Sequence, residues 1–225
     1  MGTKTHALTR DELGRYIDLI TRLSGPLLPY AAIAAIITGT GARIGEVLAL
    51  RMGDIFDQHG KPLPEITRTL EKKRSSTPVR LSVFFPWDTL GAPVIRWRDE
   101  ARRRFLISRT SLLFSLRYSG EPMNRVHCWR VHRELLQRAG IDPRGVAFHG
   151  IRKTFLTAMC AERERLQGSA GMITVMRSMQ KLAGHSRFDT TLDYLQDYIG
   201  LPHQQVSDGF FHQFTKKESK PCSRS

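Results

Sequence analysis

The spacing of apolar residues predicts a chain made mainly of helices. Thr9-Arg10-Asp11-Glu12 has the form of a capping box, and the apolar residues that follow it keep roughly helical spacing. The segment from Pro29 to Ile37 is apolar almost all round, which predicts a helix buried in the core. After a break at Thr38-Gly39-Thr40-Gly41, we expect a helix from Arg43 to Leu50. Asn124 is a plausible N-cap further on, and we expect more helices at about 88–107, 124–138, 149–162, 172–183, 189–197 and 203–214.

Between Asp54 and Phe85 the pattern changes from helical spacing to short runs typical of strands. Glycine and proline interrupt the first half of this region, and the runs Ile66 to Leu70 and Val79 to Phe85 enclose a polar, basic turn. They predict a β-hairpin whose tip is Lys72-Lys73-Arg74. The expected fold is therefore a mainly helical single domain with a small antiparallel sheet in its first third.

The charge of the chain suggests its partner. Lys and Arg total 35 against 21 Asp and Glu, which gives a net charge of +14 over 225 residues. Such an excess suits a polyanion, either nucleic acid or an anionic membrane surface. The longest apolar run, Tyr30 to Ile37, is far shorter than the ~20 residues of a membrane span. The N-terminus has no signal-peptide pattern, and three scattered cysteines indicate a reducing cytoplasm without a structural metal. A soluble, cytoplasmic DNA-binding protein is the expectation.

Four short segments carry residues suited to metal-free cleavage of a phosphodiester. They are Thr40 to Glu46, the hairpin lysines, His149-Gly150-Ile151-Arg152, and Leu182-Ala183-Gly184-His185 followed by Tyr194. Two guanidinium groups can stabilise the charge of a pentavalent phosphate, and a Lys or His can give a proton to the leaving oxygen. A tyrosine, with a pKa of ~10, becomes a nucleophile when cations or a base activate it.

These residues resemble the tyrosine recombinase, or phage integrase, family. Its motifs are an Arg in a Gly-x-Arg-x-x-Glu turn, a Lys on a β-hairpin, His-x-x-Arg, and Leu-x-Gly-His with a Tyr nine residues later. Tyr194 follows His185 by nine residues, and the resemblance extends from Leu8 to about Tyr198. Each motif alone is weak, but together in this order they form a specific pattern.

The resemblance implies a role for each matching residue. Arg43 and Arg152 would hold the scissile phosphate, Lys72 would protonate the 5′ oxygen as it leaves, and His149 would assist proton transfer to and from Tyr194. His185 would hydrogen-bond a phosphate oxygen, and Glu46 would orient the active-site side chains. Tyr194 would attack to form a 3′-phosphotyrosyl link, which keeps the bond energy and so needs no cofactor and no metal.

Several assignments leave an alternative open. Lys73 competes with Lys72 as the catalytic lysine, and the remaining tip residues, including Arg74, would bind the DNA backbone. Tyr198 lies four residues after Tyr194, and the family spacing favours Tyr194. The basic stretch from Arg96 to Arg104 is either a solvated face or a phosphate contact. Which face of the 124–138 helix carries Arg125, Arg130 and Arg133 is open, and the three tryptophans are expected in the core.

The chain departs from the usual family pattern in two places. It begins at the catalytic-domain preamble ALTRDEL, so the N-terminal core-binding domain of most members is expected to be absent or to lie outside this sequence, and the length is similar to that of the fimbrial-switch invertases. We expect one catalytic domain at 1–215 and a disordered basic tail at 216–225. The separation of Arg152 from His185 is longer than usual, and we assign the excess to a surface loop at 161–171.

The expected partner is double-stranded DNA. We expect a homo-tetramer on paired sites and a monomer or dimer in solution, with accessory DNA-binding proteins as possible further partners. The apolar residues Val206, Phe210, Phe211 and Phe214 could pack in cis as part of the core. The family resemblance implies instead that this segment docks on a neighbouring protomer, which is the interpretation we favour. Two other functions compete with site-specific recombination. One is a type IB topoisomerase-like nicking-closing enzyme, and the other is an inactive DNA-binding regulator of a mobile element.

Overall fold

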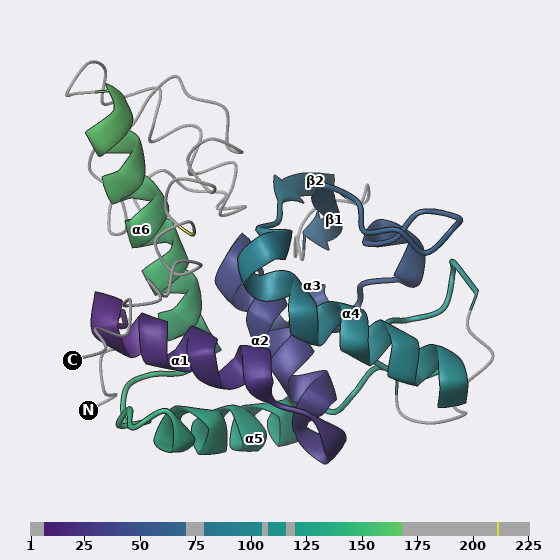
Figure 1. Ribbon diagram of the computed structural model, residues 1–225, viewed down its shortest axis with the longest axis horizontal. Helices are drawn as coiled ribbons and strands as arrows, with labels where there is room; N and C mark the ends of the chain where they lie inside the picture. The colour runs from purple at the N-terminus through teal and green to yellow at the C-terminus, as the bar shows by residue number, and fades with distance from the viewer. Residues whose placement is uncertain (1–6, 71–78, 105–107, 116–119, 168–210, 212–225) are drawn as a thin grey trace, which may run out of the picture.

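A computed structural model describes residues 7–70, 79–104, 108–115, 120–167 and 211, with the side chains of 160–167 left aside. Figure 1 shows a mainly helical arrangement with one hairpin of strands, as the sequence predicts. Its elements in chain order are α1 (Arg10–Arg22), η1 (Gly25–Leu27), α2 (Leu28–Thr40), α3 (Ile44–Leu48), η2 (Met52–Asp54), β1 (Glu65–Leu70), β2 (Val79–Phe84), α4 (Trp87–Arg104), α5 (Arg125–Arg138) and α6 (Phe148–Gln167).

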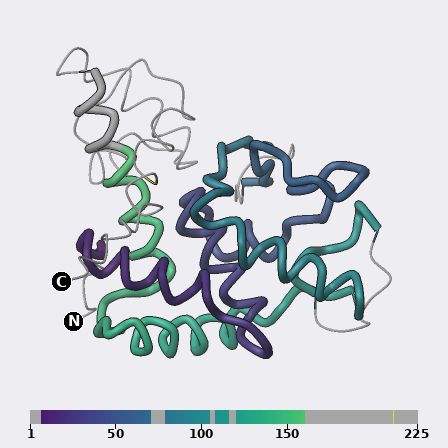
Figure 2. Tube along the Cα trace, viewed as in Figure 1, coloured from purple at the N-terminus to yellow at the C-terminus, as the bar shows by residue number. Residues whose placement is uncertain are grey.

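Helix α1 begins at the predicted capping box. The Thr9 hydroxyl accepts a hydrogen bond from the Glu12 backbone N–H, and the Glu12 carboxylate accepts one from the Thr9 N–H at 2.8 Å. After Arg22 the chain turns by 120° into η1 and α2. Helices α1 and α5 then run side by side across the molecule (Figures 1 and 2).

Helix α2 is the centre of the core and contacts α1, α3, α4, α5 and α6. It ends at Thr40, so the break expected at Thr38 is wrong. The Thr38 and Thr40 hydroxyls donate to backbone carbonyls one turn back, and Gly39 lies so close to Phe85 that a Cβ there would be 2.6 Å from its ring. Gly41 caps the helix, and its φ of +60° suits a residue without a side chain.

Strands β1 and β2 confirm the predicted hairpin. They pair antiparallel with Glu65 opposite Phe84 and Leu70 opposite Val79, and the Thr67 and Ser82 hydroxyls lie 2.8 Å apart across the pair. The turn between them, with Lys72, Lys73 and Arg74, lies outside the described residues.

The last described helices refine two expectations. Asn124 caps α5 as predicted, because its side chain accepts from the backbone N–H groups of Val126 and His127. Helix α6 continues to Gln167, so the first part of the expected 161–171 loop is helical. The helices expected at 172–183 and 189–197 lie outside the described residues, as does all of 203–214 except Phe211.

Phe211 is buried in the same chain, and its carbonyl accepts a hydrogen bond from Thr89 of α4 at 3.4 Å. This residue of the C-terminal segment therefore packs in cis here.

None of the helices within the described ranges is both long and apolar enough to cross a membrane by itself. In the part of the chain that the structure describes, one sharply bent pair, α1 with the segment Gly25–Thr40, passes that test of length and composition together.

Candidate active site

Arg43 lies at the N-terminus of α3, directly after the loop that ends α2. Its backbone is extended, with φ −73° and ψ 149°, and its N–H donates to Glu46 Oε2 at 2.9 Å. The guanidinium Nη1 also donates to Glu46 Oε1 at 3.0 Å, and the Arg43 side chain keeps 32% of its surface exposed. Glu46 therefore holds Arg43 through both backbone and side chain while leaving the guanidinium accessible. The wider role expected for Glu46, to orient the active-site side chains, stays a prediction.

Arg152 reaches the same loop from α6. Its side chain is buried, and its Nη1 donates to the carbonyl of Gly41. Phe155, one turn further along α6, packs so closely on Gly41 that a Cβ there would meet its ring at 2.5 Å. The close approach of α6 therefore depends on a glycine at position 41, and it brings Arg152 beside Arg43.

His149 lies in the first turn of α6 and is exposed. It lines a cleft of about 200 Å³ together with Arg43, Arg152 and five other residues, Ala42, Ile44, Gly45, Arg125 and Phe148. Three of these residues are arginines, and none of the described lining residues is acidic. Guanidinium groups bind phosphate oxygens in pairs of hydrogen bonds, so the cleft suits a phosphate group.

The surroundings of His149 favour its neutral form. Although the residue is exposed, the protein packed around its ring removes part of its hydration. This desolvation, and then the positive charges of Arg152, Arg43 and Lys153, hold the pKa of His149 below its ordinary value. The imidazole is therefore neutral at pH 7 and able to accept a proton.

Arg68 is a member of this site that the sequence analysis missed. It lies on β1 and is almost fully buried, and it forms an ion pair with the Glu46 oxygen that also accepts from the Arg43 backbone. Ile66, Arg68 and Leu70 are the buried positions of the strand. A charged residue at an inward position of an otherwise alternating strand was the signal that could have found it.

The structure also fixes the exposed face of α5. Arg125 lines the cleft, Arg130 is exposed, and the Arg133 guanidinium lies 5.0 Å from the centre of the Trp129 ring. Trp129 is 41% exposed, so the expectation that all tryptophans lie in the core is wrong for this one.

The basic stretch from Arg96 to Arg104 lies in α4, and several of its side chains contact other parts of the protein. Trp97 is buried and donates to the Leu113 carbonyl at 2.9 Å, and Arg96 donates to the Thr21 carbonyl. Arg103 and Arg104 both pair with Glu100 on their own helix. Of the two alternatives, these contacts favour a structural and solvated face over a phosphate contact.

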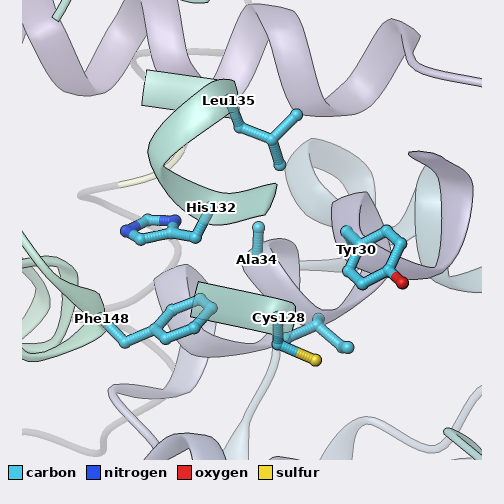
Figure 3. A pocket seen from close by; sticks show the side chains of 7 residues that line it. Tyr30, Ala34, Cys128, His132, Leu135 and Phe148 are labelled. Carbon is cyan, nitrogen blue, oxygen red and sulfur yellow. The ribbon is translucent and has the colours of Figure 1, made fainter. Parts of the chain in front are cut away.

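A second hollow lies behind the cleft, between α2 and α5 (Figure 3). Phe148 lines both, and on this side its ring stacks on His132, with the ring centres 4.2 Å apart. His132 is buried, and its Nδ1 lies 2.9 Å from the Tyr16 hydroxyl of α1. Burial lowers the pKa of His132 to about 3, so the ring is neutral and part of the core that supports the start of α6.

Three of the six predicted catalytic residues, Arg43, His149 and Arg152, are thus brought together with Glu46. The others, Lys72, His185 and Tyr194, lie outside the described residues, as do Lys73 and Arg74. No group of three His, Cys, Asp or Glu side chains that would suit a metal ion occurs within the described ranges.

The amino-acid sequence matches a known protein family. The model described as "Phage integrase family" matches residues 7–199, which is most of the chain and includes all six predicted catalytic residues. The chain belongs to the phage integrase family. This confirms the resemblance on which the residue roles were based.

Named relatives in the family are tyrosine recombinases. The chain is 29% identical to tyrosine recombinase XerD of Corynebacterium glutamicum over 191 residues, covering 83% of this chain and 55% of the relative. It is 31% identical to XerD of Mycobacterium tuberculosis over 171 residues, which cover 76% of this chain and 49% of that relative. The chain therefore spans about half the length of these relatives.

The fold is similar to that of a solved recombinase. The crystal structure of XerH site-specific recombinase bound to difH substrate, a pre-cleavage complex, aligns with a TM-score of 0.62 at 17% identity, over 86% of this chain and 51% of that chain. The expected fold class, mainly helical with a small antiparallel sheet, is confirmed.

Proposed function

We propose that this chain is the catalytic part of a site-specific recombinase that cuts and rejoins DNA through a 3′-phosphotyrosyl intermediate. The observation that carries the proposal is the convergence of Arg43, His149 and Arg152 on one cleft. Its lining is cationic and, among the described residues, without an acid. Segments more than a hundred residues apart in the chain supply these groups.

In the proposed reaction Arg43 and Arg152 bind the non-bridging oxygens of the scissile phosphate and stabilise the charge that develops there. His149 is neutral at pH 7 and takes the proton of the Tyr194 hydroxyl as the oxygen attacks phosphorus. The bond between phosphorus and the 5′ oxygen breaks, and Lys72 gives that oxygen a proton. His185 donates a hydrogen bond to a phosphate oxygen.

Rejoining is the same reaction in reverse, with a 5′ hydroxyl as the attacking group. The phosphotyrosyl link replaces one phosphodiester with another, so the bond energy is conserved and no nucleotide cofactor is needed.

The proposed partner is double-stranded DNA. The net charge of +14 favours a polyanion, and the exposed face of α5 continues from the cleft through Arg125, Val126, Trp129 and Arg130. Arginines would contact phosphates, while the exposed apolar side chains of Val126 and Trp129 suit the thymine methyl groups in a groove.

We further propose that residues 1–215 act as one catalytic domain in a homo-tetramer on paired sites, assembled from monomers or dimers and assisted where needed by accessory DNA-binding proteins. The order and orientation of the sites in DNA would then set the outcome as integration, excision, inversion or resolution. A mobile element or plasmid in a bacterial cytoplasm is the proposed setting.

A covalent-trapping experiment tests the function. The recognition site is first selected from a random duplex library by binding to the purified chain, and a duplex with that site is then nicked near the cleavage position. A protein–DNA adduct that resists SDS is expected with the wild-type chain and is lost in Tyr194→Phe. A selected site that is bound tightly but never linked would favour the inactive regulator instead.

The topoisomerase alternative makes a different prediction. A nicking-closing enzyme relaxes supercoiled plasmid that carries one site or none, as a monomer. A recombinase exchanges strands between plasmids only when two sites are present, so recombinant products from two-site plasmids alone support the proposal.

A further inference from the structure

One carboxylate, that of Glu46, is shared by two arginines. Arg43 donates its Nη1 to Oε1 at 3.0 Å, and Arg68 pairs with Oε2. The exposures differ strongly, since 32% of the Arg43 side chain is accessible whereas those of Glu46 and Arg68 are 0% and 1% exposed. The site therefore holds a connected group of three charges, of which two are buried and one faces the cleft.

Orientation of Arg43 does not require Arg68. Glu46 already fixes Arg43 through the backbone N–H and the guanidinium. Burying a second guanidinium is costly, because a charge removed from water loses its hydration, and such groups are seldom buried without a partner. The presence of Arg68 thus calls for a reason beyond holding Arg43 in place.

The balance of charge supplies that reason. A carboxylate paired only with Arg43 would cancel its charge and repel a phosphate brought to the same guanidinium. With Arg68 in place, the three groups carry one net positive charge, and the only exposed member is Arg43. Burial opposes ionisation of Glu46, but the charge of Arg68 and then the hydrogen bonds and charge of Arg43 hold the pKa of Glu46 below its ordinary value.

We propose that Arg68 is a positioning residue that neutralises Glu46, so that Arg43 is held by the carboxylate yet keeps its positive charge for the scissile phosphate. This inference rests on the proposed function, in which Arg43 binds phosphate.

The test measures the rate of adduct formation in a single turnover at saturating DNA, with the nicked duplex described above. Arg68→Met removes the charge but keeps an unbranched side chain, and it is expected to slow the reaction on the order of 10- to 100-fold. That is less than the about 100- to 1,000-fold cost of removing a donor to a developing oxyanion outright. Arg68→Lys keeps the charge and is expected to retain most of the rate.

The decisive variant is Arg68→Met combined with Glu46→Gln. The amide oxygen can still accept one of the two hydrogen bonds that Arg43 donates to Glu46, and the amide carries no charge. Arg43 therefore regains its net charge, and the double variant is expected to be at least about tenfold faster than Arg68→Met alone. If Arg68 served only packing, the second change would add damage rather than restore the rate. The double variant also removes the buried charge of Glu46, which in Arg68→Met is balanced by Arg43 alone. This keeps the comparison with wild type possible if Arg68→Met alone does not fold.

Arg80→Met is the matched control. Arg80 lies on β2 of the same hairpin, is 61% exposed and pairs with Asp54, so its loss is expected to leave the rate unchanged.

The outcomes separate the two proposals. If the wild-type chain forms the adduct but the folded double variant is as slow as Arg68→Met, the role of Arg68 is overturned and the proposed function is not. Where the single variant does not fold, a double variant at least 100-fold slower than wild type has the same meaning. Absence of any adduct with the wild-type chain overturns the proposed function and this inference with it.

Discussion

At the scale of single residues, the site depends on which side chains hold a charge and which stay neutral. Glu46 and Arg68 are charged although buried, because each has an opposite charge beside it. His132 is buried without such a partner and is neutral, and its Nε2 has no hydrogen-bond partner among the described residues. Each state follows from the balance between desolvation and pairing.

His132 predicts a loss of stability in acid. Its pKa is about 3 in the folded chain and ordinary, near 6.5, once unfolded, so the unfolded state binds more protons below pH 6.5. The neutral ring contributes its full stabilisation above pH 6.5. As the pH falls below 6.5, the free energy of unfolding decreases by about 1.4 kcal/mol per pH unit, so that roughly 2–3 kcal/mol is lost at pH 4.5. When the free energy of unfolding is measured with urea between pH 7 and 4.5, its slope against pH should be shallower in His132→Asn than in wild type. The same change at exposed His59 should leave the slope as in wild type, and equal slopes in all three proteins would contradict the assignment.

The choice between Lys72 and Lys73 has a chemical test at the same scale. A 5′ thiolate, with a pKa of about 8.5, leaves without a proton, whereas a 5′ alkoxide needs one. The Lys72→Ala variant should therefore cut an ordinary nicked duplex at least about 100-fold more slowly than wild type, which is the low end of general-acid effects. Its cleavage rate should recover on a duplex with sulfur at the 5′ bridging position. Lys73→Ala serves as the control and should show neither effect. The reverse pattern would assign the general acid to Lys73.

At the scale of elements, the site is built on one junction, where the loop between α2 and α3 meets the start of α6. Gly41 is the contact point, since it ends α2, accepts a hydrogen bond from Arg152 and packs under Phe155. The elements that carry Arg43 and Arg152 are therefore fixed to each other by a backbone approach that leaves no room for a side chain.

Gly41→Ala tests this junction. An added Cβ would meet Phe155 at 2.5 Å, and the left-handed backbone adds about 1–2 kcal/mol. We expect a loss of about 2–5 kcal/mol in the free energy of unfolding, since overpacking adds a further 1–3 kcal/mol, and at least a tenfold slower adduct formation. Gly25→Ala is the control, because Gly25 has a similar φ of +63° but nothing within 4 Å of an added Cβ. It should lose only the backbone contribution and cleave at the wild-type rate, and equal effects of the two changes would contradict the role of the junction.

The elements also show what sequence reasoning reaches. The capping box, the hairpin and the Asn124 cap follow local rules, and all three were predicted at nearly the observed positions. The end of α2 was placed too early. The Phe85 ring packs against Gly39, and the Thr38 hydroxyl donates to a backbone carbonyl inside the helix, and both interactions depend on the packed structure. Arg68 was missed because it pairs with Glu46 only once β1 packs against α3, and no spacing in the sequence predicts that contact.

The motif residues were easier to place than their surroundings. Arg43, His149 and Arg152 were predicted from family motifs and do share a cleft. Arg125 was named without a face, and only the packing of α5 places it in the same cleft.

At the scale of the whole molecule, the excess of 14 positive charges should make DNA binding depend strongly on salt. Each phosphate contact contributes about 0.9 to the slope of log affinity against log salt. Arg125→Ala should reduce this slope by about one on a duplex carrying the selected site. Arg22→Ala, on an exposed pair with Asp18, should leave it unchanged, and an unaltered slope for Arg125→Ala would place α5 away from the phosphates.

The central claim is that a tyrosine of this chain becomes joined to DNA, and mass spectrometry of the trapped adduct tests it most directly. After nuclease and protease digestion, the account predicts a peptide in which Tyr194 carries a 3′-linked nucleotide. No such peptide is expected from Tyr194→Phe or from a chain with Arg43 and Arg152 both changed to alanine. A nucleotide on Tyr198 or on any other residue, or tight and specific binding without a covalent peptide, would contradict it.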